Sequence, residues 1–232
     1  MHDSTPRAFD RLGAAAGVVS VALLVALLMF FPSLPAADES IATIAGDASN
    51  TKQMLLVGDY VGLVMGGLWL LFGVVVSARL RRAESAAGAW WMVALAGITA
   101  SAAVGLVGNL FSVMFVRAVG HGLSDDALWT IYSGDLVGFA QGVPLALFML
   151  GVGFGTRATG VFPRWMGILA LASIPLLGLG VASIAGREVD GGPFILPLML
   201  AYLGMLVWTI AASVVLWRRP VAHPFGVVTT PA

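Results

Sequence analysis

Two aspartates in long apolar stretches are the residues of this sequence best placed to do chemistry. Asp59 and Asp135 occur in two similar nine-residue segments, GDYVGLVMG at 58–66 and GDLVGFAQG at 134–142. A carboxylate in apolar surroundings is costly unless it is paired, hydrogen-bonded or bound to a cation. The duplication therefore predicts a repeated membrane hairpin that carries an acid at the same position in each copy, where a cation or small ligand could bind.

Three further polar residues are expected at a similar depth. Asn109 and Arg117 lie in the outer half of the intervening apolar segment, and Gln141 lies in the second repeat. With a rise of about 1.5 Å per residue, both aspartates are about 30 Å from the arginines that end their helices, close to the outer edge of the membrane. The candidate ligand-binding residues are therefore Asp59, Asn109, Arg117, Asp135 and Gln141. Each acid could instead face outer water or stabilise the start of its helix.

Glycines at every fourth position accompany each aspartate. A helix face without side chains lets a neighbouring helix approach closely and gain dispersion contacts in lipid. The spacing predicts tight packing of the two repeats against the helix between them, with a ligand-binding groove as the alternative. The helix-packing residues are Gly58, Gly62, Gly66, Gly134, Gly138 and Gly142.

The composition is that of an integral membrane protein. Of 232 residues, 59% are hydrophobic and only 10% charged, and the mean hydropathy is +0.96, well outside the range of soluble domains. We expect an all-α polytopic transmembrane bundle of six helices in a single domain, residues 1–232, built as three consecutive hairpins with a parallel internal repeat. The predicted spans are 12–31, 54–78, 89–115, 128–154, 165–185 and 194–217, each apolar enough and long enough to cross the hydrocarbon core.

The distribution of basic residues predicts the orientation. Cytoplasmic loops of membrane proteins carry an excess of Lys and Arg. The outer side of the predicted topology holds only Lys52, Arg117 and Arg187. The inner side holds Arg7, Arg11, Arg79, Arg81, Arg82, Arg157, Arg164, Arg218 and Arg219. A multi-pass protein of the cell membrane with both termini in the cytoplasm is therefore expected.

The first apolar segment has two interpretations. Arg7 and Arg11 before an apolar core, with Pro35 and Ala37 near a cleavage point, could form a secretory signal. The apolar stretch is longer than a usual signal core, which favours a retained helix. Cleavage would leave five spans and an external N-terminus.

The loop at 32–53 is the longest one on the outer side. Its Ile41 and Ile44 have the spacing of a short helix that could lie at the lipid headgroups. The tyrosines fall in the outer third of the predicted bundle, where an interfacial aromatic belt explains them. They are Tyr60, Tyr132 and Tyr202.

Several classes of function are disfavoured by what the sequence lacks. A formal net charge of zero gives no general attraction to nucleic acid, and zero cysteines exclude thiol chemistry and disulfides. His2, His121 and His223 lie in tails or a loop, which argues against haem and histidine-bound metal. Ser133 has no intramembrane base to activate it. No catalytic residue, metal or cofactor is predicted.

Several segments together resemble a family of six-helix bacterial integral membrane proteins of unknown function. The likeness covers about residues 10–219 and supports the six-span topology, and the family has no established activity to carry over. The segments are IATIAGDAS at 41–49, LLVGDYVG at 55–62, RLRR at 79–82, FPRWMGILALA at 162–172 and SVVLWRR at 213–219.

Two hypotheses of function follow. The first is a membrane protein that binds a small ligand or cation in an outer polar pocket around Asp59, Asn109 and Asp135. The second is a structural or partner-binding subunit that packs through its glycine stripes, either on itself as a homo-oligomer or on another membrane protein. An intramembrane enzyme lacks a recognisable pair of base and nucleophile. In either case the lipid bilayer surrounds the chain, and no nucleic acid partner is expected.

Overall fold

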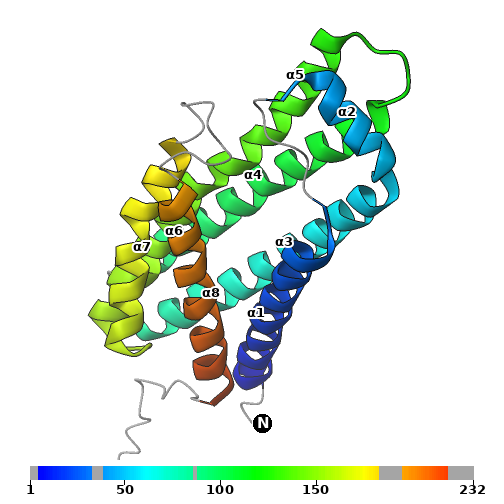
Figure 1. Cartoon of the computed structure of the whole chain (residues 1–232). Coiled ribbons are helices and arrows are strands. Elements are labelled where there is room, and N and C mark those ends of the chain that lie inside the picture. Colours follow the sequence, from blue (N-terminus) through cyan, green and yellow to red (C-terminus); the bar gives the residue numbers. More distant parts are fainter. Residues whose placement is uncertain (1–4, 33–38, 86–87, 183–194, 219–232) are drawn as a thin grey trace, which may run out of the picture.

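The computed structural model describes residues 5–32, 39–85, 88–182 and 195–218 of the chain. This described part is entirely helical, as the sequence predicts, and contains no strand (Figure 1). The elements are α1 (Thr5–Phe30), α2 (Ile41–Asn50), α3 (Lys52–Ala83), α4 (Trp90–Ala118), α5 (Asp125–Asp135), the 3₁₀ helix η1 (Leu136–Gln141), α6 (Gly142–Thr159), α7 (Arg164–Ala182) and α8 (Ile195–Arg218).

Five of these helices are long and apolar enough to cross a membrane. The apolar part of α7, Arg164–Leu179, is shorter than the others. The structure therefore confirms a helical membrane bundle, while the predicted sixth span stays a proposal. The five stretches are Arg7–Phe30, Lys52–Ala83, Trp90–Ala118, Gly142–Thr159 and Met199–Arg218.

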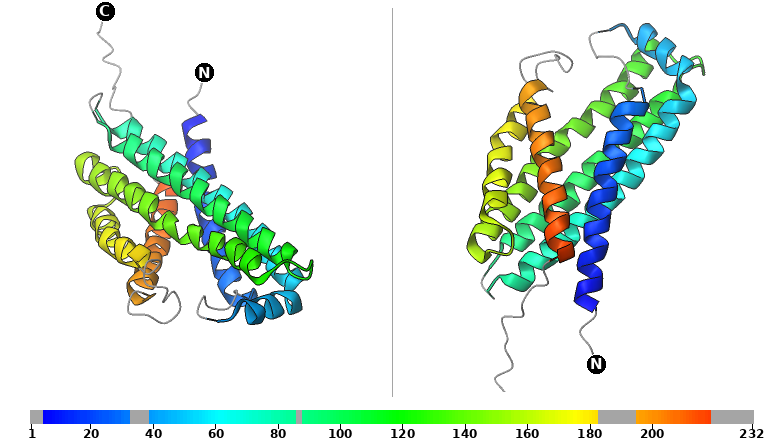
Figure 2. Two further views of the ribbon diagram at one scale, coloured as in Figure 1. Left: turned by 90° about the horizontal axis from the view of Figure 1, so that it is seen from above. Right: turned by 60° about the horizontal axis from the view of Figure 1, so that its bottom comes forward.

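The long helices pack in chain order and close into a bundle. Helix α4 contacts both α3 and α6, α7 contacts α6 and α8, and α1 lies against both α3 and α8. The start of α1 and the ends of α3 and α8 lie at one end of the bundle, and α2 and α5 lie at the other (Figures 1 and 2). We call these the Asp10 end and the α2 end.

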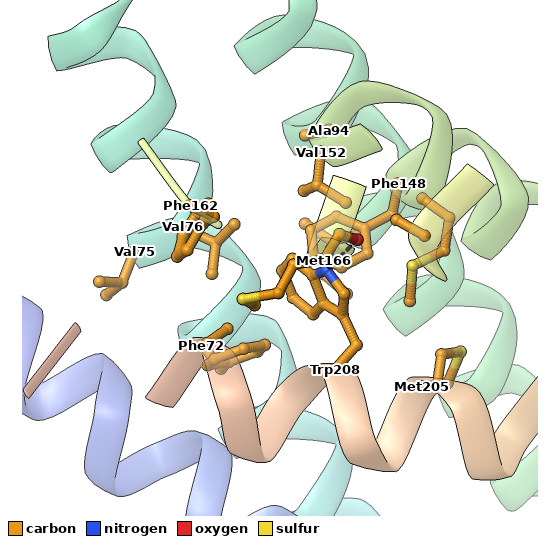
Figure 3. Close-up of a cluster of buried hydrophobic side chains, with 14 of the residues drawn as sticks. Phe72, Val75, Val76, Ala94, Phe148, Val152, Phe162, Met166, Met205 and Trp208 are labelled. Atoms are coloured by element: carbon orange, nitrogen blue, oxygen red, sulfur yellow. Dashed lines mark hydrogen bonds between the residues drawn. The ribbon is translucent and has the colours of Figure 1, made fainter. Parts of the chain in front are cut away.

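The main core is centred on Trp208 of α8 (Figure 3). This ring is 1% exposed, and its indole N–H donates to the Met166 carbonyl of α7 at 3.1 Å. Phe72 and Phe148 meet it edge-on, with ring centroids 6.1 and 5.9 Å away, in the arrangement that aromatic quadrupoles favour. One residue thus connects α3, α6, α7 and α8.

Glycines set the closest backbone approaches. A Cβ at Gly97 of α4 would collide with the Phe148 backbone of α6, and a Cβ at Gly151 of α6 would collide with the Ala94 backbone of α4. On the other side of α6, a Cβ at Gly153 would lie 2.7 Å from the Leu171 side chain of α7. Small residues therefore fix the position of α6 between α4 and α7.

The predicted short helix in the outer loop exists, but it packs differently from the expectation. Ser40 caps α2 by accepting from the Thr43 N–H at 3.2 Å. Ile44 is fully buried instead of facing headgroups, because α2 folds onto α3, α4 and α5. We call the resulting group the outer cluster; it comprises Ile44, Ala48, Leu55, Phe115, Val116, Val119, Leu128 and Tyr132.

The predicted fourth span, 128–154, is divided in the structure. Helix α5 ends at Asp135, η1 covers Leu136–Gln141, and α6 begins at Gly142. Pro144 explains the break, because it has no N–H to donate to the carbonyl four residues earlier and its ring would clash with that carbonyl. In the first turn of α6 the missing donor has no consequence. The corresponding residue of the first repeat is Leu68, and α3 continues through it.

A buried ion pair joins α1 to α3 at the Asp10 end. Asp10 is 4% exposed and Arg79 is 2% exposed; the Arg79 Nη1 donates to Asp10 Oδ2 at 3.2 Å. Arg82 donates to the other oxygen, Oδ1. Further along α1, Gly17 lies against Phe72. Helix α1 is thus packed as a member of the bundle.

We expect Asp10→Asn to lower the free energy of unfolding by roughly 3 kcal/mol, because two guanidinium groups lose the charge that compensates them. Denaturation of the purified protein in detergent measures the change. Asp47→Asn is the control, since Asp47 is exposed on α2 and its loss should have little effect. Equal stabilities of the two variants would contradict a structural role for the ion pair.

Candidate functional site

Asp59 of α3 forms a side-chain hydrogen bond to α4. Ser112 of α4 donates from its Oγ to Asp59 Oδ1 at 3.0 Å. The second carboxylate oxygen, Oδ2, is buried and has no hydrogen-bond partner among the described residues. Most buried polar atoms have a partner, so this oxygen marks the place where another group could bind.

Asn109 lies one turn from Ser112 on the same face of α4. Its Nδ2 donates to the Gly105 carbonyl at 3.4 Å, while its Oδ1 lies against Gly62 of α3. A Cβ at Gly62 would come within 3.1 Å of that oxygen. Asp59 and Gly62 on α3 therefore face Ser112 and Asn109 on α4, and the glycine leaves the room that the amide occupies.

The second repeat reaches the same level of α4 from another side. Gly134 lies against the ring of Phe111, the neighbour of Ser112 in the chain, and a Cβ at Gly138 would lie 3.6 Å from the Gly108 Cα. The two motifs are thus matched in depth along α4. The side chain of Asp135 lies outside the described residues, so its approach to Asp59 stays a prediction.

Gln141 lies further from the α2 end and connects η1 to α8. Its Nε2 donates to the Tyr202 hydroxyl at 3.3 Å. A Cβ at Gly105 would lie 2.7 Å from its Oε1. Because Gly105 also accepts from Asn109, the amides of Asn109 and Gln141 meet the same residue of α4.

Arg117 stands apart from these contacts. It is exposed in the last turn of α4. Both ion pairs within the described part of the chain are formed by Asp10, so Arg117 does not neutralise Asp59 in this conformation.

The predicted packing glycines have different neighbours. A Cβ at Gly58 would lie 3.3 Å from the Phe31 ring, and a Cβ at Gly142 would lie 2.7 Å from the Val181 side chain of α7. Gly66 has no atom within 4 Å of its Cβ position. The stripe on α3 therefore contacts the end of α1, then α4, and then becomes open.

Ser112 is the site residue that the sequence reasoning missed. Its position one helical turn after Asn109 was the available signal, because both residues then share a face. The outer cluster continues from this point: Leu55 lies one turn before Asp59 on α3, and Phe115 lies one turn after Ser112 on α4. Apolar side chains and α2 thus cover the Asp59 contact on the side of the α2 end.

The donor set limits the chemistry of the site. Among the side chains that the structure describes, it comprises one carboxylate, one hydroxyl and one amide oxygen. The described residues contain no group of three His, Cys, Asp or Glu side chains that could hold a metal ion. A single negative charge matches a proton or a monovalent cation. In comparisons with protein-family models, characterised proteins and solved structures, no match to this chain was found.

A second carboxylate, that of Glu84, lies at the Asp10 end. Glu84 directly follows α3, and its Oε1 accepts the Trp91 N–H at the start of α4 at 3.1 Å. Its Oε2 is buried, and no described residue hydrogen-bonds to it. Burial raises the pKa of the Glu84 carboxyl above its usual value, and hydrogen bonds from the Trp91 and Trp90 backbone only partly offset this. The group caps α4, whose own N-cap residue, Ala89, has no side-chain acceptor.

We expect Glu84→Gln to stabilise the protein at pH 8 relative to wild type, and the difference to shrink as the pH falls toward 4.5. An acid whose pKa is raised by folding binds its proton more tightly in the folded state than in the unfolded state. Its ionisation therefore destabilises the fold at a pH above the folded-state pKa. This destabilisation is absent at a pH below the unfolded-state pKa. Glutamine keeps the acceptor for the Trp91 N–H without the charge.

Unfolding temperatures of both proteins across this pH range test the expectation. Glu39→Gln is the control, because Glu39 is exposed before α2. A Glu84→Gln difference that does not change with pH would contradict it.

Proposed function

We propose that this membrane protein binds a proton or a monovalent cation at Asp59, between α3 and α4. The proposal rests on the different environments of the two oxygens of its carboxylate. One oxygen accepts from Ser112, and the other is buried with no hydrogen-bond partner in the described part of the chain.

A bound cation would complete this environment. An ionised carboxylate held away from water keeps a large desolvation penalty until a positive charge or a set of donors compensates it. Protonation removes the charge, and a small cation neutralises it. The Ser112 hydroxyl and the Asn109 Oδ1 supply the hard oxygen ligands that such cations prefer.

The proposed site can be extended to include Asp135, the aspartate of the second repeat. Its motif meets α4 at the level of Asp59, through Gly134 and Phe111. If its carboxylate also turns toward α4, the pocket would hold two acids together with Asn109 and Gln141, as the repeated sequence predicts.

The proposed topology has six spans, with α7 as the fifth, and both termini in the cytoplasm. The arginine-rich Asp10 end is then the inner side, and the α2 end is the outer side. Asp59 is placed in the outer part of the membrane, where a cation would enter past α2 and the outer cluster. The resemblance to six-helix bacterial membrane proteins is consistent with this topology.

A second candidate function is a structural or partner-binding subunit. Gly66 and its neighbour Gly67 both have an open Cβ position, so this part of α3 offers a small-residue surface to another helix, in a second copy of the chain or in another membrane protein. Gly62 and Gly138 lie against α4 and serve internal packing instead.

For the cation site, we expect Asp59→Asn to abolish a dependence of the unfolding temperature on sodium or on pH that wild type shows. Purified protein in detergent would be titrated with NaCl against choline chloride at pH 8, and from pH 8 to pH 5 in choline chloride. Asp135→Asn, made alone and with Asp59→Asn, tests whether the second acid contributes.

Asp47→Asn is the matched control, because it makes the same substitution at an exposed acid of the α2 end. A wild-type response that survives in Asp59→Asn, or that Asp47→Asn removes equally, would reject the site.

For the second candidate, we expect Gly66→Leu to reduce crosslinking of the protein into larger species in native membranes, because a leucine there would block helix approach at a position whose Cβ has no neighbour within 4 Å. Gly46→Leu is the control, since Gly46 has a similarly open Cβ position but lies on α2. Crosslinked species that persist in Gly66→Leu, or only monomers in wild type, would count against a partner at this surface.

A further inference from the structure

We propose that α2 is a lid over the Asp59 site, which swings aside to let a proton or cation enter from the α2 end. The inference rests on the proposed binding at Asp59 and adds the control of access to it. Helix α2 lies across this end of the bundle, where it contacts α3, α4 and α5 (Figure 1). The arguments are the side chains that it covers, the small face that holds it and the single residue that joins it to α3.

Apolar side chains separate the Asp59 contact from the α2 end. Leu55 lies four residues before Asp59 on α3, and Phe115 lies three residues after Ser112 on α4. Each is therefore one helical turn closer to the α2 end than the polar residue on its own helix. Both are buried in the outer cluster, to which α2 contributes Ile44. Helix α2 thus completes the apolar cover over the site.

A narrow face holds α2 on the bundle. Its buried side chains are Ile44 and Ala48, which lie one turn apart on the same side of the helix. The rest of its surface includes the exposed polar residues Thr43, Asp47 and Asn50. The free energy that holds an element on a fold grows with the apolar area that the element buries. Helix α2 therefore opens more readily than the long helices, each of which packs along much of its length.

Thr51 is the single residue that joins α2 to α3, and its geometry is that of a hinge. Its φ of −112° and ψ of 13° depart from the α-helical values on either side. Its N–H donates to the Asp47 carbonyl of α2 at 3.1 Å, and its carbonyl accepts the Leu55 N–H of α3 at 3.0 Å. Rotation about the two Thr51 dihedral angles moves the N–H with α2 and the carbonyl with α3. Helix α2 can therefore swing without breaking either bond, as hinges require.

The occupancy of Asp59 would bias this lid. An ionised carboxylate without a cation gains free energy from contact with water, so it favours the open position of α2. A bound proton or cation removes this gain and lets the outer cluster close. Because coupling between binding and closure is reciprocal, closure in turn strengthens the binding. The lid would therefore close over an occupied site and open over an empty one.

The test measures how fast a thiol in the site reacts with a charged, water-soluble maleimide, using the full-length protein in lipid nanodiscs. The chain has no cysteine, so Ser112→Cys places a single thiol beside Asp59. We expect slow labelling while α2 is intact, relative to Asp47→Cys at an exposed position of α2. Adding Ile44→Ala should accelerate the labelling at Ser112→Cys about ten-fold or more, because truncation of a buried isoleucine weakens the cover and labelling follows its open fraction.

Ile98→Ala is the matched control. It truncates an equally buried isoleucine that lies between α4 and Gly73 of α3, and should leave the labelling at Ser112→Cys unchanged. Ser101→Cys, about three turns further from the α2 end on α4, is the control for depth and should stay slow with Ile44→Ala. Equal acceleration by Ile98→Ala, or at Ser101→Cys, would overturn the lid in favour of general loosening. Fast labelling with α2 intact, or no effect of Ile44→Ala, would overturn it as well.

The labelling requires no bound cation, so it separates the lid from the cation site. Labelling that depends on Ile44, together with a sodium or pH response that survives Asp59→Asn, would keep the lid and reject the site. Labelling that is independent of Ile44, with a response that Asp59→Asn abolishes, would reject the lid and keep the site. If Ser112→Cys cannot be recovered folded, Leu55→Cys decides by the same criteria, because Leu55 lies under the same cover.

Discussion

The hydrocarbon core of a membrane supplies no water, so every polar group inside this bundle needs a partner from the protein itself. Most of the described groups meet this requirement locally. The Trp208 indole uses a carbonyl of the next helix, and Ser77 returns its hydroxyl to the Gly73 carbonyl. Asp10 has both oxygens engaged by arginines. Asp59 departs from the rule with one oxygen, as the hydroxyls of Thr156 and Ser213 also do. Among these three groups the Asp59 carboxyl is the one that can ionise, which makes it the candidate binding site.

The position of α4 determines where the Asp59 carboxylate and its second oxygen lie. Its backbone meets α6 at Gly97 and Gly151, which fixes how far α6 and the preceding η1 and α5 lie along it. The face that carries Asn109 and Ser112 is turned to α3. As a result, the two repeated motifs arrive at one level on different sides of the same helix. A helix with larger side chains at the glycine positions could not bring both motifs so close.

Hydropathy and residue spacing were sufficient to predict the helical membrane class, the approximate extents of most spans, and the similar depth of Asp59 and Asn109. These features depend on composition and on the helical period, which are local. The pairing of Asp10 with Arg79 and Arg82 was not predicted, because the residues are far apart in the sequence and Asp10 sits among the charges that precede an apolar core. Ser112 was missed because a single hydroxyl in a membrane helix is most often bonded to its own backbone.

The sequence repeat also predicted more similarity than the structure has. The two motifs share their glycines and aspartate, yet α3 is one continuous helix while the second copy passes through η1. Local sequence identity did not decide the conformation; the proline that follows the second motif did. The residue responsible, Pro144, lies just outside the repeated residues, so the repeat alone does not reveal the break.

The 3₁₀ segment has a geometric consequence for α5. A 3₁₀ helix rises about 2.0 Å per residue with three residues per turn, against about 1.5 Å and 3.6 for an α-helix. If the six residues of η1 adopted α-helical form, the segment would shorten by about 3 Å. Helix α5 would then rotate by about 120° about the helix axis relative to α6. The winding of η1 therefore couples two movements of α5, translation along its axis and rotation about it. Any change in this winding would move the aspartate at the end of α5 together with the outer cluster.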